Sequence, residues 1–99
     1  MTKKKLYTKR VNKGIKWLNK YYPGWFRKIK ISELQMASGL TCICGQLYGQ
    51  FSNIYKEGFS GLETVSHGFY LSIIIRDDSD YLLLTDIWTE KIKKLIKKK

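Results

Sequence analysis

Apolar residues recur every three or four positions over residues 8–21, a spacing that places them on one face of an α-helix. This face holds Val11, Ile15, Leu18 and Tyr22. At about 100° per residue, the opposite face holds a lysine stripe that consists of Lys9, Lys13, Lys16 and Lys20. The pattern predicts an amphipathic first helix that ends at Pro23-Gly24 and presents four ammonium groups to water.

The middle of the chain predicts shorter elements. Ser32 and Gln35 have capping-box spacing, which predicts a short helix that starts at Ser32 and ends at Ser38-Gly39. Thr41 is the expected N-cap of a longer helix, whose core face would hold Ile43, Leu47, Phe51 and Ile54. Residues 57–69 contain three glycines and predict a long connection, and residues 70–75 predict a short β element.

A last helix is predicted from aspartates at its start and lysines at its end, because both match the helix macrodipole. Its buried stripe would consist of Tyr81, Leu84, Trp88, Ile92 and Leu95. Three further apolar residues lie beside this stripe and would be partly exposed on a monomer, namely Leu82, Leu83 and Ile87. We therefore expect a homo-oligomer that covers them.

Together these elements predict a mainly α-helical single domain over residues 1–99, built as a compact bundle of three principal helices plus a short helix. A chain of this length buries enough surface for one core. Residues 1–7 and 97–99 are expected to form flexible basic tails. No apolar run approaches the length that a bilayer requires, and lysines interrupt any apolar segment of a secretory signal, so we expect no membrane insertion and an intracellular location.

Positive charge is concentrated at the two ends of the chain. There are 19 Lys and Arg against 8 Asp and Glu, which gives a formal net charge of +11. Residues 1–30 hold 11 basic residues and no acidic one, and residues 91–99 hold six lysines. Surfaces that serve solubility alone more often mix both signs, so this segregation favours an anionic partner. Lysine-rich ends that are only solvated are the alternative interpretation.

The first candidate function is the binding of a small nucleotide. Arg27 and Lys28 would pair with its phosphates. Trp25 or Tyr48 would stack on its base, and Gln46 would hydrogen-bond the edge of that base. These five residues form the predicted ligand site, and the lysine stripe is the predicted surface for larger anions.

The second candidate function is the binding of nucleic acid. Phosphates would be neutralised by the lysine stripe, by Arg27 and Lys28 and by the C-terminal lysines, while Trp17, Tyr21 and Trp25 would stack on bases. No helix-turn-helix, zinc-finger or RNA-binding signature is present, so the contacts would be nonspecific and sensitive to salt.

An enzyme would have to use Cys42 or Cys44 as a nucleophile and His67 as its base. Nothing in their spacing requires them to meet, and both cysteines and His67 are expected to be structural. Two cysteines and one histidine do not spell out a metal site. We therefore predict no catalytic residue, no metal and no cofactor.

Five short motifs occur in a fixed order along the chain: W-L, P-G-W, C-x-x-G-Q-x-x-G, G-F and L-T-x-x-W. They are Trp17-Leu18, Pro23-Gly24-Trp25, residues 42–49, Gly68-Phe69 and residues 84–88. Over residues 14–92 the chain thereby resembles a family of small uncharacterised proteins that bacteriophages and prophages encode. It departs from the family pattern at Gly39, where relatives often have Cys, and at Tyr70, where they often have Asp or Asn.

The resemblance implies a phage accessory protein in the host cytoplasm, and small phage proteins of this kind often block host defence. We therefore predict a counter-defence binding protein that sequesters a phosphate-bearing nucleotide signal. The alternatives are a nonspecific nucleic-acid-binding protein and an inhibitor that binds directly to a host defence protein.

Overall fold

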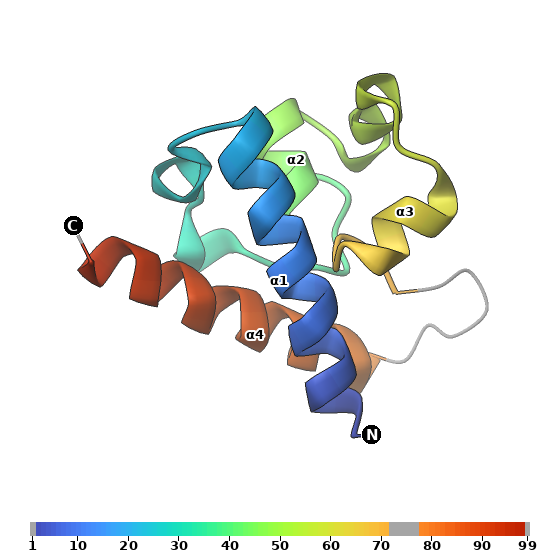
Figure 1. Ribbon diagram of the computed structural model, residues 1–99. Coiled ribbons are helices and arrows are strands. Elements are labelled where there is room, and N and C mark those ends of the chain that lie inside the picture. Colours follow the sequence, from blue (N-terminus) through green and yellow to red (C-terminus); the bar gives the residue numbers. More distant parts are fainter. Residues whose placement is uncertain (1, 72–77, 99) are drawn as a thin grey trace.

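The computed structural model describes residues 2–71 and 78–98 and contains two long helices that cross, α1 (Lys3–Tyr21) and α4 (Asp78–Lys97) (Figure 1). Two short α-helices and three 3-10 helices (η) lie between them in the chain: η1 (Trp25–Lys28), η2 (Ile31–Glu33), α2 (Ile43–Tyr48), η3 (Phe51–Glu57) and α3 (Gly61–Ser66). No strand occurs within the described ranges, which confirms the mainly α-helical compact bundle. Of the predicted β element, residues 70 and 71 are not in a strand and residues 72–75 lie outside the described residues.

The first helix is longer than its apolar pattern predicted. It begins at Lys3, because the hydroxyl of Thr2 caps it by accepting the N–H of Lys5 at 3.2 Å. Residues 3–7, predicted as part of a flexible tail, are therefore helical, and Tyr7 is buried. The helix ends before Gly24, whose φ of +80° is in the left-handed region.

The helix predicted after Thr41 is divided into two elements. Its N-cap is Cys42, whose Sγ accepts the N–H of Gly45 at 3.3 Å. Gly49 ends α2 because its φ of +94° is incompatible with the helix, and the chain continues as the 3-10 helix η3. The long third helix of the prediction is therefore a single short α-helix followed by a tighter one.

The two capping-box patterns of the sequence behave differently. The segment after Ser32 forms only the 3-10 helix η2, since the N–H of Met36 pairs with the hydroxyl of Thr85 in α4 at 2.9 Å. Ser60 and Glu63, by contrast, form a complete capping box at the start of α3. Residues 57–69, predicted as a connection, therefore contain a helix.

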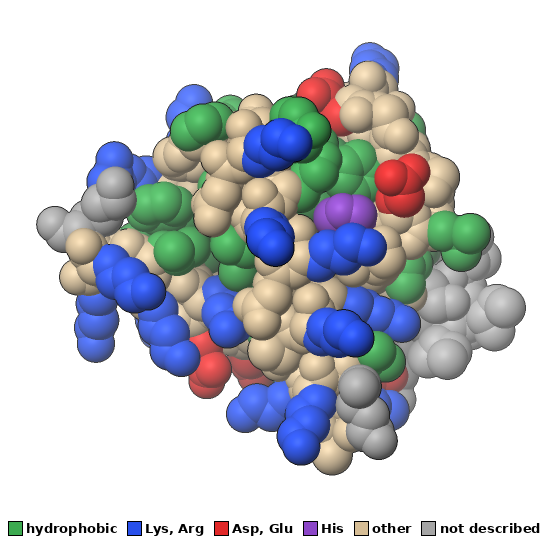
Figure 2. All heavy atoms as spheres, viewed as in Figure 1, with side chains coloured by type: hydrophobic (Ala, Val, Ile, Leu, Met, Phe, Trp, Pro, Cys, Tyr) green, Lys and Arg blue, Asp and Glu red, His purple; other side chains and the backbone are tan. Residues whose placement is uncertain are grey.

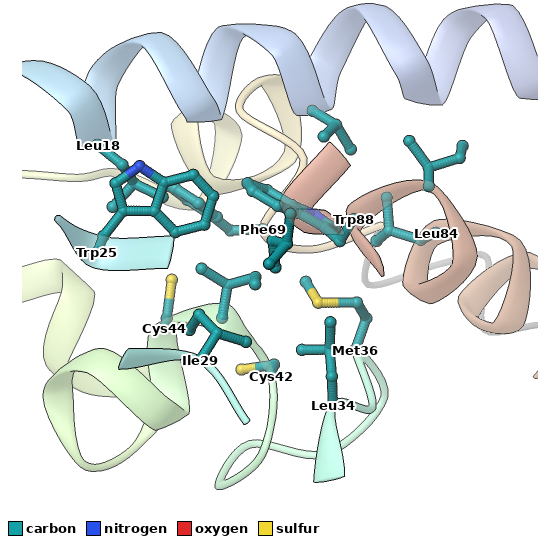
Figure 3. Close-up of a cluster of buried hydrophobic side chains, with 14 of the residues drawn as sticks. Leu18, Trp25, Ile29, Leu34, Met36, Cys42, Cys44, Phe69, Leu84 and Trp88 are labelled. Carbon is teal, nitrogen blue, oxygen red and sulfur yellow. The ribbon is translucent and has the colours of Figure 1, made fainter. Parts of the chain in front are cut away.

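The core is centred on three aromatic rings from different parts of the chain, Trp25, Phe69 and Trp88 (Figure 3). Trp88 lies 5.8 Å from each of the other two rings, edge-on to Trp25 and stacked on Phe69. Its Nε1 donates to the carbonyl oxygen of Gly68 at 2.8 Å. Residues 29–44 supply Ile29, Leu34, Met36, Cys42 and Cys44, which close the core below these rings in this view.

The predicted surface of α4 is partly correct. Leu82 is 66% exposed, as expected, but Ile87 is buried and the prediction that it lies on the surface is wrong. Ile87 instead packs into the same core as Trp88. None of the helices in the described part of the chain is long and apolar enough to span a bilayer.

Gly14 allows α1 to approach the segment after α3. A Cβ atom at this position would collide with the carbonyl oxygen of His67 and would lie 3.2 Å from Trp88. We expect Gly14→Ala to lower the free energy of unfolding by about 1–3 kcal/mol, because the backbone must shift to admit the methyl group. Urea denaturation followed by circular dichroism measures this change.

The matched control is Gly61→Ala in the first turn of α3, where an added Cβ would meet no atom within 4 Å. This variant should be as stable as the parent or more stable by about 0.4–1 kcal/mol. Equal denaturation midpoints for the two variants would contradict the close contact at Gly14.

Candidate functional site

The lysine stripe of α1 lies on the outer face of the helix, as predicted. All four of its lysines are exposed, and they form no ion pair with any residue in the ranges 2–71 and 78–98. Figure 2 shows Lys and Arg side chains over the length of α1 and over the C-terminal half of α4. The charge at the two ends of the chain therefore meets on one side of the molecule.

Two shallow hollows extend this charge along the flank of α1 that carries Asn12, and the second of them reaches α4. The first, of about 560 Å³, is lined by Thr2, Lys4, Lys5, Thr8, Lys9 and Asn12. The second, of about 190 Å³, lies between the helices and is lined by Asn12, Ile15, Lys91, Lys94, Leu95 and Lys98. The hollows meet at Asn12. We call the two hollows together with the lysine stripe the basic face.

The first turn of α1 carries positive charge at the end of the helix where it is unfavourable. Lys3, Lys4 and Lys5 lie at the positive pole of the helix macrodipole, and this turn has no acidic residue. Lys3 is compensated by Asp80 of α4, whose carboxylate lies 3.2 Å from its Nζ. Lys4 and Lys5 have no such partner among the described residues. Helix stability thus does not explain their charge.

The structure separates the five residues of the predicted ligand site. Trp25 is fully buried, its Nε1 donates to Asn19 Oδ1 at 2.9 Å, and its ring packs against Trp88. Gln46 is engaged at both ends of its amide: Oε1 accepts the N–H of Lys30 at 2.7 Å, and Nε2 donates to the carbonyl of Thr41 at 2.9 Å. In this structure both residues support the fold and offer no group to a ligand.

The other three residues of the predicted ligand site are two exposed cations and the partly buried Tyr48. Arg27 and Lys28 are exposed, and the Nζ of Lys28 lies 5.2 Å from the centre of the Tyr22 ring. Tyr22 also contacts Tyr48 edge-on at 5.7 Å. Burial, with a smaller contribution from the charge of Glu57, raises the pKa of Tyr48 to about 12, so this phenol stays neutral. Lys28 and Tyr48 are thus linked through Tyr22, but Trp25 and Gln46 are not part of this group of contacts.

The two thiols and His67 occupy structural positions. Burial raises the pKa of Cys42, and burial together with the neighbouring Cys42 raises the pKa of Cys44, so both thiols are neutral at pH 7. The Nδ1 of His67 lies 2.7 Å from the carbonyl oxygen of Glu63, and its ring contacts Phe59 and Phe69. Among the described residues, no three His, Cys, Asp or Glu side chains gather into a potential metal site.

Sequence reasoning named the C-terminal lysines as phosphate contacts, but it missed the hollows and therefore missed Asn12. It also did not place Lys91, Lys94 and Lys98 beside α1. The available signal was the gathering of charge at both ends of the chain, but only the crossing of α1 and α4 places the C-terminal lysines beside the middle of α1.

Comparison with protein-family models, with curated proteins and with solved structures finds no match to this chain. The resemblance to phage proteins stays a prediction.

Proposed function

We propose that the protein binds the phosphate backbone of nucleic acid along its basic face. The observation that carries the proposal is the lining of the two hollows, which contains six lysines and no acidic residue: Lys4, Lys5, Lys9, Lys91, Lys94 and Lys98. A surface with charges of one sign raises the local concentration of an oppositely charged polymer. The lysine stripe continues this field across α1.

The chemistry of the lining supports binding without sequence preference. Lysine acts as a mobile point charge toward phosphate, whereas the planar guanidinium of arginine provides bidentate contacts. Every basic residue of the basic face is a lysine. Asn12, at the point where the hollows meet, adds an amide that can hydrogen-bond to phosphate or sugar.

A specific observation also favours the sequestration of a nucleotide as a second candidate function. The second hollow is lined by three lysines and Asn12 together with the apolar residues Ile15 and Leu95, and lysines pair with the phosphate group of a nucleotide. In this version of the nucleotide hypothesis, the ligand does not contact Trp25 or Gln46 and binds instead between α1 and α4. Counter-defence in the host cytoplasm, with a homo-oligomer as the active form, is the biological setting we propose for it.

The test is a salt titration of binding with the full chain, followed by fluorescence anisotropy. If about six phosphates are contacted, the affinity for duplex DNA should fall about a thousandfold between 50 and 200 mM salt. An oligomer of the same bases with an uncharged methylphosphonate backbone is the control and should not bind. Binding of this control, or no binding of either polymer at low salt, would contradict the proposal.

Native mass spectrometry with mononucleotides and dinucleotides separates the second candidate from the first. An adduct of one nucleotide per chain that persists near physiological ionic strength, without polymer binding, would favour sequestration. If neither polymer nor nucleotide binds, the remaining candidate is an acidic protein surface of the host.

A further inference from the structure

Two aromatic side chains lie beside the lysine stripe, one helical turn apart on α1. The rings of Trp17 and Tyr21 are 5.0 Å apart and tilted by 41°. Tyr21 is 59% exposed, so most of its ring faces water. An exposed aromatic ring beside cationic side chains has the composition of a surface on which the bases of a single strand stack.

The partly buried Trp17 is fixed from the opposite side. The ring of Phe59, in the segment between η3 and α3, packs edge-on against it at 4.8 Å, and Phe59 is itself buried. Trp17 in turn limits the positions open to Tyr21. The pair is therefore already ordered in the free protein, which reduces the entropy that a stacked ligand would lose on binding.

The lysine stripe, the hollows and the aromatic pair occupy adjacent strips of the α1 surface. At about 100° per residue, the lysine stripe occupies the centre of the outer face, Asn12 and the hollows lie on one side, and Trp17 and Tyr21 lie on the other. Lys20 belongs to the stripe and also lies against the aromatic pair, with its Nζ 5.2 Å from the centre of the Tyr21 ring. Cations and stacking surfaces thus run side by side along one helix.

We propose that Trp17 and Tyr21 form a stacking platform that makes the protein prefer single-stranded nucleic acid over duplex. The proposal rests on the backbone binding proposed above and adds the class of polymer. Phosphates on the lysine stripe would leave the unpaired bases of a single strand free to stack on the platform. In a duplex the bases are paired and stacked on one another, so only its phosphates can be contacted. Phe59 acts as a positioning residue.

The experiment compares an unstructured oligonucleotide of about 20 nucleotides with the duplex of the same sequence. Tyr21→Leu is expected to weaken single-strand binding about tenfold, because one base loses its stacking partner. Duplex affinity and the salt slope should stay unchanged, since no phosphate contact is removed. Tyr21→Phe keeps the ring and should restore single-strand binding.

The matched control is Tyr55→Leu in η3, which removes another exposed tyrosine, 44% exposed, away from α1. It should leave the affinity for both polymers unchanged. Equal losses for single strand and duplex with Tyr21→Leu, or no loss with either, would overturn the stacking platform while leaving backbone binding intact. If the parent binds neither polymer at low salt, both proposals fail.

A further comparison measures binding to single-stranded DNA and to single-stranded RNA of the same base sequence, in order to identify the natural polymer. Because stacking uses the faces of the bases, the loss caused by Tyr21→Leu should be similar in both arms, whereas the parent affinity can differ between them. A loss confined to one sugar type would overturn stacking as its cause, since it would indicate contacts to the 2′-hydroxyl instead.

Discussion

Trp88→Ala is expected to leave the protein largely unfolded at room temperature. Removing a fully buried tryptophan costs about 3–5 kcal/mol, and the carbonyl of Gly68, which loses the indole N–H, adds about 1–3 kcal/mol. Domains of this size have a total free energy of unfolding of about 5–15 kcal/mol. The loss of about 4–8 kcal/mol is comparable to the whole stability at the lower end of that range, which is expected for a chain of this length, and far-UV circular dichroism with urea denaturation should show it.

Trp88→Phe separates the two contributions. Phenylalanine retains an aromatic ring against Trp25 and Phe69 but cannot donate to Gly68, so we expect a folded protein destabilised by about 1–3 kcal/mol. If Trp88→Ala lowered the free energy of unfolding by less than about 1 kcal/mol, the arrangement of the core around Trp88 would be wrong.

Reversing two charges in the lysine stripe should have the largest effect on binding. We expect Lys13→Glu with Lys16→Glu to weaken nucleic-acid binding about a hundredfold or more, because two attractive contacts become repulsive. The slope of log affinity against log salt concentration should also become shallower by about 1–2. Glutamate has a helix propensity close to that of lysine, so α1 should stay folded, which circular dichroism checks.

The matched variant carries Arg27→Glu with Lys28→Glu, because these exposed residues of η1 belong to the predicted ligand site. Both double variants reduce the formal net charge from +11 to +7, so a general effect of net charge would weaken binding equally. We expect the variant in η1 to lose much less affinity. A greater loss of affinity in the η1 variant would show that the binding surface lies at η1 and not at α1.

The long helices could be predicted from the sequence because their apolar residues repeat at the helical period. The pattern of α1 gave both its buried side and its exposed lysines. The pattern of residues 41–57 also had this period, yet Gly49 divides it, because one backbone angle there outweighs the side-chain pattern. The short helix α3 has too few residues for periodicity to reveal it, and its one local signal was the capping box of Ser60 and Glu63.

The ligand site was harder to predict, because a residue suited to binding can equally serve the fold. Trp25 and Arg27 both lie in the segment outside the predicted core stripes, and this suggested that the two face the same ligand. In the tight turn of η1, Trp25 and Phe26 face the core, while Arg27 and Lys28 face water. Gln46 likewise has the polar groups that a base would need, but the backbone of Lys30 and Thr41 uses them.

Four of the five motifs behind the predicted resemblance to phage proteins occupy structural positions. Residues 23–25 end α1 and place Trp25 in the core, and residues 42–49 begin and end α2. Residues 68–69 and 84–88 join at the hydrogen bond between Trp88 and Gly68. Proteins that share these motifs should therefore share this fold, whereas the basic face lies mainly outside them and can differ from one protein to the next.

The contact between Gly14 and His67 has a consequence for the opposite side of α1. Turning a helix by a single residue rotates its surface by about 100°, enough to move a lysine of the stripe toward the core. Because Gly14 is seated against a backbone carbonyl and leaves no room for a Cβ, α1 is held at one angle about its own axis. The direction in which the ammonium groups point is thus set by the smallest residue on the buried side, so the charges of the lysine stripe are oriented by the fold itself.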